Sequence, residues 1–150
     1  MIFVTVGTSQ SFDRLVEAVT RWRTRSPDTQ VFIQGGPKFA PIFGCECVAT
    51  LSAADHEYMM RSAELVVAHA GIRTILRAQA LQRPLVVMPR QAVLGEHRSD
   101  HQVELARVLD TKRLARVAFT SGELLRALEQ RESIQPPSRA DLSGVAMYAG

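Results

Sequence analysis

The stretch from residue 64 to 90, ELVVAHAGIRTILRAQALQRPLVVMPR, has two apolar strand-like runs that flank a helix-like segment. His69, Ala70 and Gly71 stand where the first run ends, and Arg73 falls in the first turn of the following helix. A glycine lets a ligand approach the backbone, and the free N–H groups of a helix N-terminus are donors for a phosphate. Arg73 opposes the helix dipole unless an anion offsets its charge. The pattern therefore indicates an anion at this turn. The alternative is an ordinary strand-to-helix turn with a solvated arginine.

A second group of residues able to do chemistry lies at 97–102. His97 and His101 are four apart, a spacing that on a helix places both on one face, as in zinc sites. However, the order EHRSDH differs from HExxH and no third ligand is evident, so we expect no metal site. Gln102 either completes a capping box with Ser99 or contacts a sugar or diphosphate, and the sequence leaves both open.

The loop after the first apolar run excludes two nucleotide-binding classes. Gly7-Thr8-Ser9-Gln10 lacks the GK[ST] of a P-loop and is not GxGxxG. Cys45 and Cys47 are too close on one strand for an unstrained disulfide, and no second cysteine pair exists for a metal. No Ser-His-Asp order and no paired carboxylates stand out near the strand ends. We therefore expect ordinary thiols here, and neither a P-loop NTPase nor a classical NAD-binding protein.

Composition places the chain among globular proteins of one domain. It has 150 residues, of which 46% are hydrophobic and 22% charged. A net charge of +3 permits attraction to phosphates or to an anionic membrane surface. The sparse aromatic residues do not alternate with basic ones, so we expect no nucleic-acid partner. No signal peptide and no apolar span of about 20 residues is evident, which predicts a cytoplasmic protein.

Apolar runs alternate with helical periodicity along most of the chain. The pattern predicts strands at 2–6, 31–33, 45–51, 65–67, 85–88 and 115–119, and helices at 12–19 (capped by Ser11), 52–61 (capped by Ser52), 72–81, 99–109 and 121–130. This alternation predicts a doubly wound, Rossmann-like α/β fold with a parallel sheet covered on both faces. Residues 1–130 form the predicted domain, and 131–150 a loosely packed or disordered tail. Ligands of such folds bind beyond the carboxyl ends of the strands.

Three stretches carry a family resemblance. MIFVTVGTSQSFDRLVEAV, LVVAHAGIRTILRAQALQRPLVVMPR and GEHRSDHQVELARVL resemble, in this order, the glycosyltransferase family 28 C-terminal domain. The sequence is most similar to small subunits of split, two-chain transferases. These are the bacterial exopolysaccharide subunits and the eukaryotic subunit that helps add the second GlcNAc to dolichol-linked sugar. The resemblance implies the C-terminal, nucleotide-sugar-binding half of a GT-B enzyme whose membrane-associated partner supplies the acceptor half. It implies no cofactor and no bound metal.

The resemblance also implies a donor site for a UDP-sugar. The residues it assigns are Gly7 and Thr8 at the cleft, His69, Ala70, Gly71, Arg73 and Thr74 at the diphosphate, and Arg90, His97, His101 and Gln102 near the donor sugar or phosphate. Many relatives carry an acidic residue in the helix after HAG, where it accepts from the ribose hydroxyls. Here Arg77 occupies that place, so Gln79 or a main-chain group takes the role, or nucleotide binding is altered.

These implications give a functional hypothesis with two rivals. The hypothesis is a donor-binding subunit of an inverting hexosyltransferase that acts with a partner chain on a polyprenyl-linked acceptor in exopolysaccharide synthesis. It would lie at the inner face of the membrane through that partner, and no catalytic base is assigned to this chain. The first rival is a non-catalytic module that stabilises or recruits a membrane transferase, and the second is a self-contained sugar-nucleotide epimerase. Whether residues 120–150 dock onto a partner, form a homodimer or stay mobile is left open.

Overall fold

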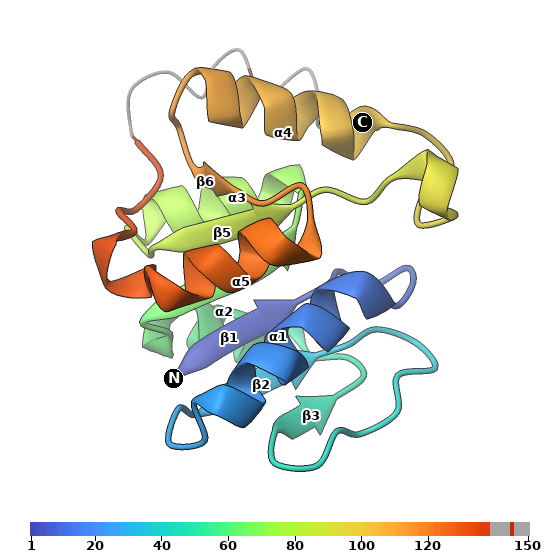
Figure 1. Cartoon of the computed structure of the whole chain (residues 1–150), viewed down its shortest axis with the longest axis vertical. Coiled ribbons are helices and arrows are strands. Elements are labelled where there is room, and N and C mark those ends of the chain that lie inside the picture. The colour runs from blue at the N-terminus through green and yellow to red at the C-terminus, as the bar shows by residue number, and fades with distance from the viewer. Residues whose placement is uncertain (139–144, 146–150) are drawn as a thin grey trace.

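The computed structural model describes residues 1–138 and Val145. Its centre is a six-stranded parallel sheet with the order β3-β2-β1-β4-β5-β6 (Figure 1). The strands are β1 (Ile2–Thr5), β2 (Val31–Gln34), β3 (Glu46–Val48), β4 (Leu65–His69), β5 (Leu85–Met88) and β6 (Arg116–Val117). The order reverses between β1 and β4, and the predicted doubly wound α/β fold is confirmed.

Helices cover both faces of this sheet. They are α1 (Asp13–Arg25), α2 (Ala53–Ser62), α3 (Ile72–Ala80), α4 (His101–Thr111) and α5 (Ser121–Glu129), with short 3₁₀ turns η1 (Ala92–Leu94) and η2 (Arg131–Ser133). Helices α1 and α5 pack together on one face, while α2, α3 and α4 bury residues against the other. Both faces of the sheet are thereby removed from water, which is why the central strands read as continuous apolar runs.

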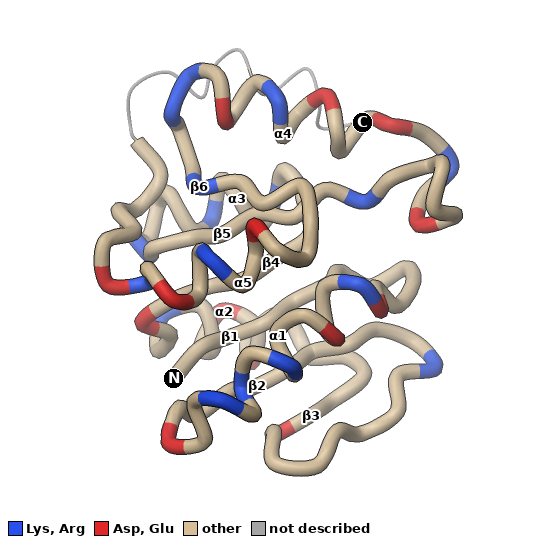
Figure 2. Tube along the Cα trace, in the orientation of Figure 1, with Lys and Arg blue, Asp and Glu red and all other residues tan. Residues whose placement is uncertain are grey.

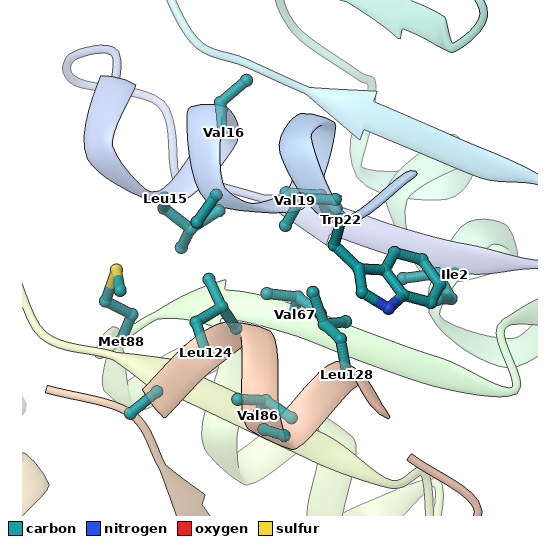
Figure 3. Packing of buried hydrophobic residues seen from close by; sticks show 14 of the residues in the cluster. Ile2, Leu15, Val16, Val19, Trp22, Val67, Val86, Met88, Leu124 and Leu128 are labelled. Carbon is teal, nitrogen blue, oxygen red and sulfur yellow. The ribbon is translucent and has the colours of Figure 1, made fainter. Parts of the chain in front are cut away.

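The apolar stripe of α1 explains how that helix docks. Leu15, Val16, Val19 and Trp22 recur at helical spacing, and all four are buried in one cluster with residues of α5 and the sheet (Figure 3). Among the strands, charged residues occur in the outer ones, Glu46 in β3 and Arg116 in β6, and the tubes of β1, β4 and β5 carry none (Figure 2). The central strands are therefore held by apolar burial on both sides.

Strand register brings three loops to one edge of the sheet. Thr5 pairs with Ala68, and His69 pairs with Met88, so the residues after β1, β4 and β5 emerge side by side. This edge is the carboxyl end of every strand, because all pairs are parallel. The position between β1 and β4 is where open α/β sheets form their ligand crevice.

Two of the predicted helix starts differ from the structure. Ser52 caps α2 as expected, since its hydroxyl accepts from the Asp55 N–H at 3.1 Å. In contrast, the N-cap of α1 is Phe12 rather than Ser11; its ring has no acceptor for a capping bond and is buried in the core instead. The capping box, one of the two roles left open for Gln102, is absent: α4 begins at His101, and the Gln102 side chain bonds to the main chain of Arg90, as described below.

The described residues near the end of the chain pack against both apolar clusters. Ile134 and Val145 are buried, one in each of the two apolar clusters, and the Ser138 N–H donates to the Leu114 carbonyl oxygen at 3.1 Å. Residues 139–144 and 146–150 of the predicted tail lie outside the described residues. Within the part of the chain that is described, no helix combines the length and apolar character that a membrane crossing requires.

Candidate functional site

A cavity of about 810 Å³ opens at the carboxyl edge of the sheet, at the reversal between β1 and β4. Its walls come from the loop after β1, one side of α2, the first turns of α3 and the start of α4. All four histidines of the chain line it: His56, His69, His97 and His101. The cavity is large enough for a small organic ligand and lies where the fold class predicts one.

The N-terminus of α3 faces this cavity without a side-chain cap. Gly71 is the N-cap residue, and among the described residues (1–138 and 145) no side chain caps the free N–H groups of the first turn. The first turn contains no acidic residue, whereas Arg73 is exposed there and lines the cavity together with Thr74. Uncapped N–H donors, the positive helix end and a cation together favour an anion at this point.

The ring of His69 fills the space between two glycines. A Cβ atom at Gly71 would lie 2.3 Å from the His69 Nε2, and one at Gly7 would lie 3.1 Å from the same atom. Gly7 also has a φ of 83°, which side chains rarely adopt. Burial, together with the nearby positive charge of Arg90, lowers the pKa of His69 to about 4. His69 is therefore neutral at pH 7 and can act there through hydrogen bonding, not through charge.

Arg90 is a buried cation of the cavity wall whose hydrogen bonds reach the loop after β1. Its guanidinium is buried and donates to the carbonyl oxygens of Val6 at 2.7 Å, Ser11 at 2.7 Å and Gln10 at 2.9 Å. It also lies 4.7 Å from the centre of the Phe12 ring. Burial lowers the pKa of Arg90 to about 10, so the group stays charged at neutral pH. Arg90 lines the cavity, but these donors hold the loop after β1 in place.

An ion pair between Arg14 of α1 and Glu96 in the loop after β5 connects these two segments. Arg14 of α1 donates from Nε to Glu96 Oε2 and from Nη2 to Glu96 Oε1, both at 3.0 Å. The same guanidinium donates to the carbonyl oxygens of Phe119 and Pro89 at 2.9 Å each. Glu96 Oε1 also accepts from the Gln91 N–H at 3.0 Å. The loop after β5 is thus fixed to both α1 and the segment before α5.

A buried polar chain supports the other side of the cavity. Gln34 donates from Nε2 to the carbonyl oxygens of Gly7 at 2.9 Å and Ala49 at 2.8 Å, so its Oε1 must accept. The Thr5 hydroxyl donates to that oxygen at 2.7 Å, and His56 Nε2 lies 3.2 Å from the same hydroxyl. Since the hydroxyl proton is already used, His56 Nε2 carries a proton and donates. Burial lowers the pKa of His56, consistent with its neutral form.

The cavity brings most of the predicted site residues together. Those that line it are Gly7, Thr8, His69, Ala70, Gly71, Arg73, Thr74, Arg90, His97, His101 and Gln102. Gln79 is not among them: its side-chain amide donates to the Ser138 carbonyl oxygen at 3.0 Å instead. Gln102 Oε1 accepts from the Arg90 N–H at 3.0 Å, which aligns α4 with the loop after β5.

The two histidines four apart do not share a helix face. His97 precedes α4 and His101 begins it, so the helical spacing that favoured comparison with zinc sites is not realised. Among the described residues, no three or more His, Cys, Asp or Glu side chains gather in a way that could hold a metal ion.

Sequence reasoning missed a carboxylate in the cavity wall. Glu57 of α2 lines the cavity and accepts from Arg77 Nε at 2.7 Å and from Arg77 Nη2. Arg61, one turn further along α2, donates to the same carboxylate at 3.0 Å. Both arginines lower the pKa of Glu57, which is therefore ionised at neutral pH. Arg77 of α3 thus holds a carboxylate supplied by another helix.

Comparison with known proteins agrees with this geometry. The model of the glycosyltransferase family 28 C-terminal domain matches residues 1–139. The chain belongs to this family. No curated protein matches the sequence significantly. The match to the family 28 C-terminal domain is continuous and covers about nine-tenths of the chain. It includes every residue that lines the cavity.

Solved structures share the fold of this family 28 domain at low sequence identity. An NMR structure of ALG13 is 18% identical with a TM-score of 0.66, and the match covers 99% of this chain and 94% of that one. The kitacinnamycin glycotransferase is 16% identical with a TM-score of 0.57, and SnogD from Streptomyces nogalater is 16% identical with a TM-score of 0.54. Each of these two matches covers 98% of this chain but only 38% and 44%, respectively, of the longer enzyme.

Proposed function

We propose that this chain is the donor-binding half of an inverting glycosyltransferase and that it binds a UDP-sugar in the cavity between β1 and β4. The observation that carries the proposal is the uncapped N-terminus of α3, with Arg73 beside it, opening into that cavity in a chain of glycosyltransferase family 28. A diphosphate meets the N–H donors and the cation there. Gly7 and Gly71 leave the room that the His69 ring occupies between them.

The proposed contribution to catalysis is electrostatic. In an inverting transfer, an acceptor hydroxyl attacks the anomeric carbon while the bond to the diphosphate breaks, and negative charge grows on the leaving UDP. Donors that are already oriented toward the diphosphate stabilise this charge without reorganising. The α3 N-terminus and Arg73 provide such donors, and the carbonyl contacts of Arg90 keep the opposite loop in position. The general base belongs to the acceptor half in this proposal.

The proposal includes a partner chain for the acceptor half. The chain corresponds to less than half the length of the kitacinnamycin enzyme and SnogD, but to nearly all of the ALG13 structure. The sequence resemblance to small subunits of two-chain transferases supports the same division. On that resemblance we also propose a hexose donor and a polyprenyl-linked acceptor in exopolysaccharide synthesis, with the chain held at the inner face of the membrane by its partner.

The test is calorimetric titration of the full chain with UDP, using two matched arginine variants. Arg73→Gln removes a cation from the proposed diphosphate site, whereas Arg107→Gln removes an equally exposed cation from α4, outside the cavity. A half-site should bind UDP with a Kd between about 1 μM and 1 mM. We expect Arg73→Gln to weaken binding about fivefold, as for loss of about 1 kcal/mol, and Arg107→Gln to leave it unchanged.

The contrary outcomes separate the alternatives. Equal losses in both variants would show that overall charge, not the α3 site, determines binding. Absence of UDP binding, both in the isolated chain and in its complex with the acceptor-binding chain, would contradict the proposal. Retained binding to that partner chain in the same experiment would then favour a non-catalytic module that recruits or stabilises a transferase.

A further inference from the structure

His97 is a residue of the cavity wall whose ring can donate a hydrogen bond to a ligand. Its Nδ1 atom accepts from the Ser99 N–H at 3.3 Å, so the ring proton is on Nε2. The oxygens of a diphosphate are acceptors, and this N–H is therefore a suitable donor for them. His97 lies in the loop between η1 and α4, outside any helix. Its place in the cavity wall consequently depends on what holds that loop.

Glu96, the residue before His97, anchors the loop through its carboxylate. The carboxylate accepts two hydrogen bonds from Arg14 at 3.0 Å each and one from the Gln91 N–H. The side chain of Glu96 is 14% exposed and that of Arg14 is 19% exposed. A two-point contact of this kind, largely shielded from solvent, fixes direction as well as distance. Neither member of the pair is among the described residues that line the cavity, so both act from behind its wall.

The main chain of Glu96 connects the same point to the facing loop. Its carbonyl oxygen accepts from the Gln10 side-chain amide, and Arg90 Nη1 donates to it at 3.5 Å. Gln10 belongs to the loop after β1, which supplies Gly7 to the cavity. The side chain thus holds residue 96 to α1, and the main chain holds it to the opposite wall. The adjacent His97 ring is placed by these two anchors.

We propose that Arg14 and Glu96 are positioning residues for the ligand of the cavity, which hold the His97 N–H where it meets the diphosphate without touching the ligand themselves. This inference rests on the proposed function and adds two residues that the cavity wall does not contain. The ion pair orders the loop after β5 before the ligand arrives, so binding does not have to order it. Loosening the pair therefore weakens binding although no ligand contact is removed.

Charge and position predict opposite effects for Glu96→Gln. The substitution removes a negative charge beside an anion-binding cavity, and Coulomb attraction alone would then strengthen diphosphate binding. Displacement of His97 weakens it. Arg14→Lys keeps the positive charge but replaces a planar two-point donor with a single ammonium. In both variants, weaker binding of the ligand therefore reports a change of position and not a change of charge.

The test is calorimetric titration with UDP of the full chain, or of its complex with the acceptor-binding chain if only the complex binds UDP. The variants are Glu96→Gln and Arg14→Lys. Glu17→Gln and Arg21→Lys are the matched controls, because they make the same chemical changes at exposed positions of α1 outside the cavity. We expect each variant to weaken UDP binding about fivefold and each control to change it less than about twofold. Circular dichroism under the same conditions verifies that each variant is folded.

Removal of the His97 side chain separates positioning from a general disturbance of the cavity. His97→Ala should itself weaken UDP binding about fivefold. Glu96→Gln added to His97→Ala should then change the affinity less than about twofold, because the group that Glu96 positions is gone. A fivefold loss from Glu96→Gln in both backgrounds would overturn the inference.

Three other results would also overturn the inference while leaving the proposed function intact. These are stronger UDP binding in Glu96→Gln, unchanged binding in both folded variants, and equal losses in the variants and their controls. Absence of UDP binding, both in the wild-type chain and in its complex with the acceptor-binding chain, would overturn the proposed function and the inference with it.

Discussion

Replacing Arg90 with lysine should cost this protein much more stability than the conservative change suggests. The buried guanidinium of Arg90 donates to three carbonyl oxygens at 2.7–2.9 Å from different directions and lies against the Phe12 ring. A lysine ammonium is a single point on a flexible stem, and we expect it to keep one of these contacts. Hydrogen bonds to charged groups contribute about 1.5 kcal/mol or more each, so the loss of two predicts about 3 kcal/mol.

Urea unfolding followed by circular dichroism at pH 7 measures this loss. The urea concentration at the transition midpoint should fall while the m value stays unchanged, because the surface exposed on unfolding is the same. The variant should still fold, since typical domains have a free energy of unfolding of about 5–15 kcal/mol. Arg107→Lys is the matched control, since this exposed arginine of α4 should change stability by no more than about 0.5 kcal/mol. A loss below about 1 kcal/mol in Arg90→Lys would refute the argument, because it would mean that the loop after β1 does not depend on the guanidinium geometry.

Three further predictions concern the same edge of the sheet. Gly71→Ala should lower the free energy of unfolding by about 1–3 kcal/mol, since the new Cβ would lie 2.3 Å from His69 Nε2. The control Gly122→Ala in α5, where the nearest atom would lie 3.9 Å away, should be neutral or stabilising, and equal melting temperatures of the two variants would contradict the prediction. The pKa of His69 is about 4 in the folded chain and 6.5 in the unfolded chain, so protonation of this group should lower the free energy of unfolding by about 3 kcal/mol between pH 7 and pH 4. In urea unfolding at a series of pH values, His69→Asn should lose this part of the pH dependence of stability, and an unchanged pH dependence would contradict the prediction. Gln34→Leu should destabilise the fold by about 2 kcal/mol, because it removes the donor to the Gly7 carbonyl oxygen and the acceptor of the Thr5 hydroxyl, whereas the Ala49 carbonyl oxygen keeps the Gly36 N–H; a free energy of unfolding within about 0.5 kcal/mol of the wild type would show that the two groups find other partners.

The fold could be predicted because local pattern and global arrangement agree. Residues 65–69 and 85–88 are apolar throughout, as a strand buried on both faces must be, and the α1 stripe from Leu15 to Trp22 has the period of a helix with one apolar face. Helix starts were less predictable. Ser11 has the right side chain for an N-cap, but burial of Phe12 fixes where α1 begins.

The part of the candidate site that could be predicted from the sequence consists of residues at the ends of strands and of the glycines beside them. His69, Gly71 and Gly7 were found because parallel strands deliver their carboxyl-end residues to one edge. Glu57 was missed because it meets Arg77 across 20 residues of sequence, through the packing of α2 beside α3. Gln34 was missed for a similar reason, although a polar residue at the end of an apolar strand is a signal that reasoning of this kind can use.

The way in which Arg90 holds the loop after β1 bears on how this protein can change over evolutionary time. All four acceptors of the guanidinium are main-chain carbonyl oxygens, three of them in this loop (Val6, Gln10 and Ser11) and one at Glu96, and every amino acid supplies that group. Substitution of the loop's own side chains therefore leaves these contacts, and with them the path of the loop, in place. Thr8 and Ser9, exposed in the cavity wall between these anchors, are free to vary. A library randomised at those two positions should yield folded proteins with altered ligand preference, which makes this loop the natural starting point for changing what the cavity binds.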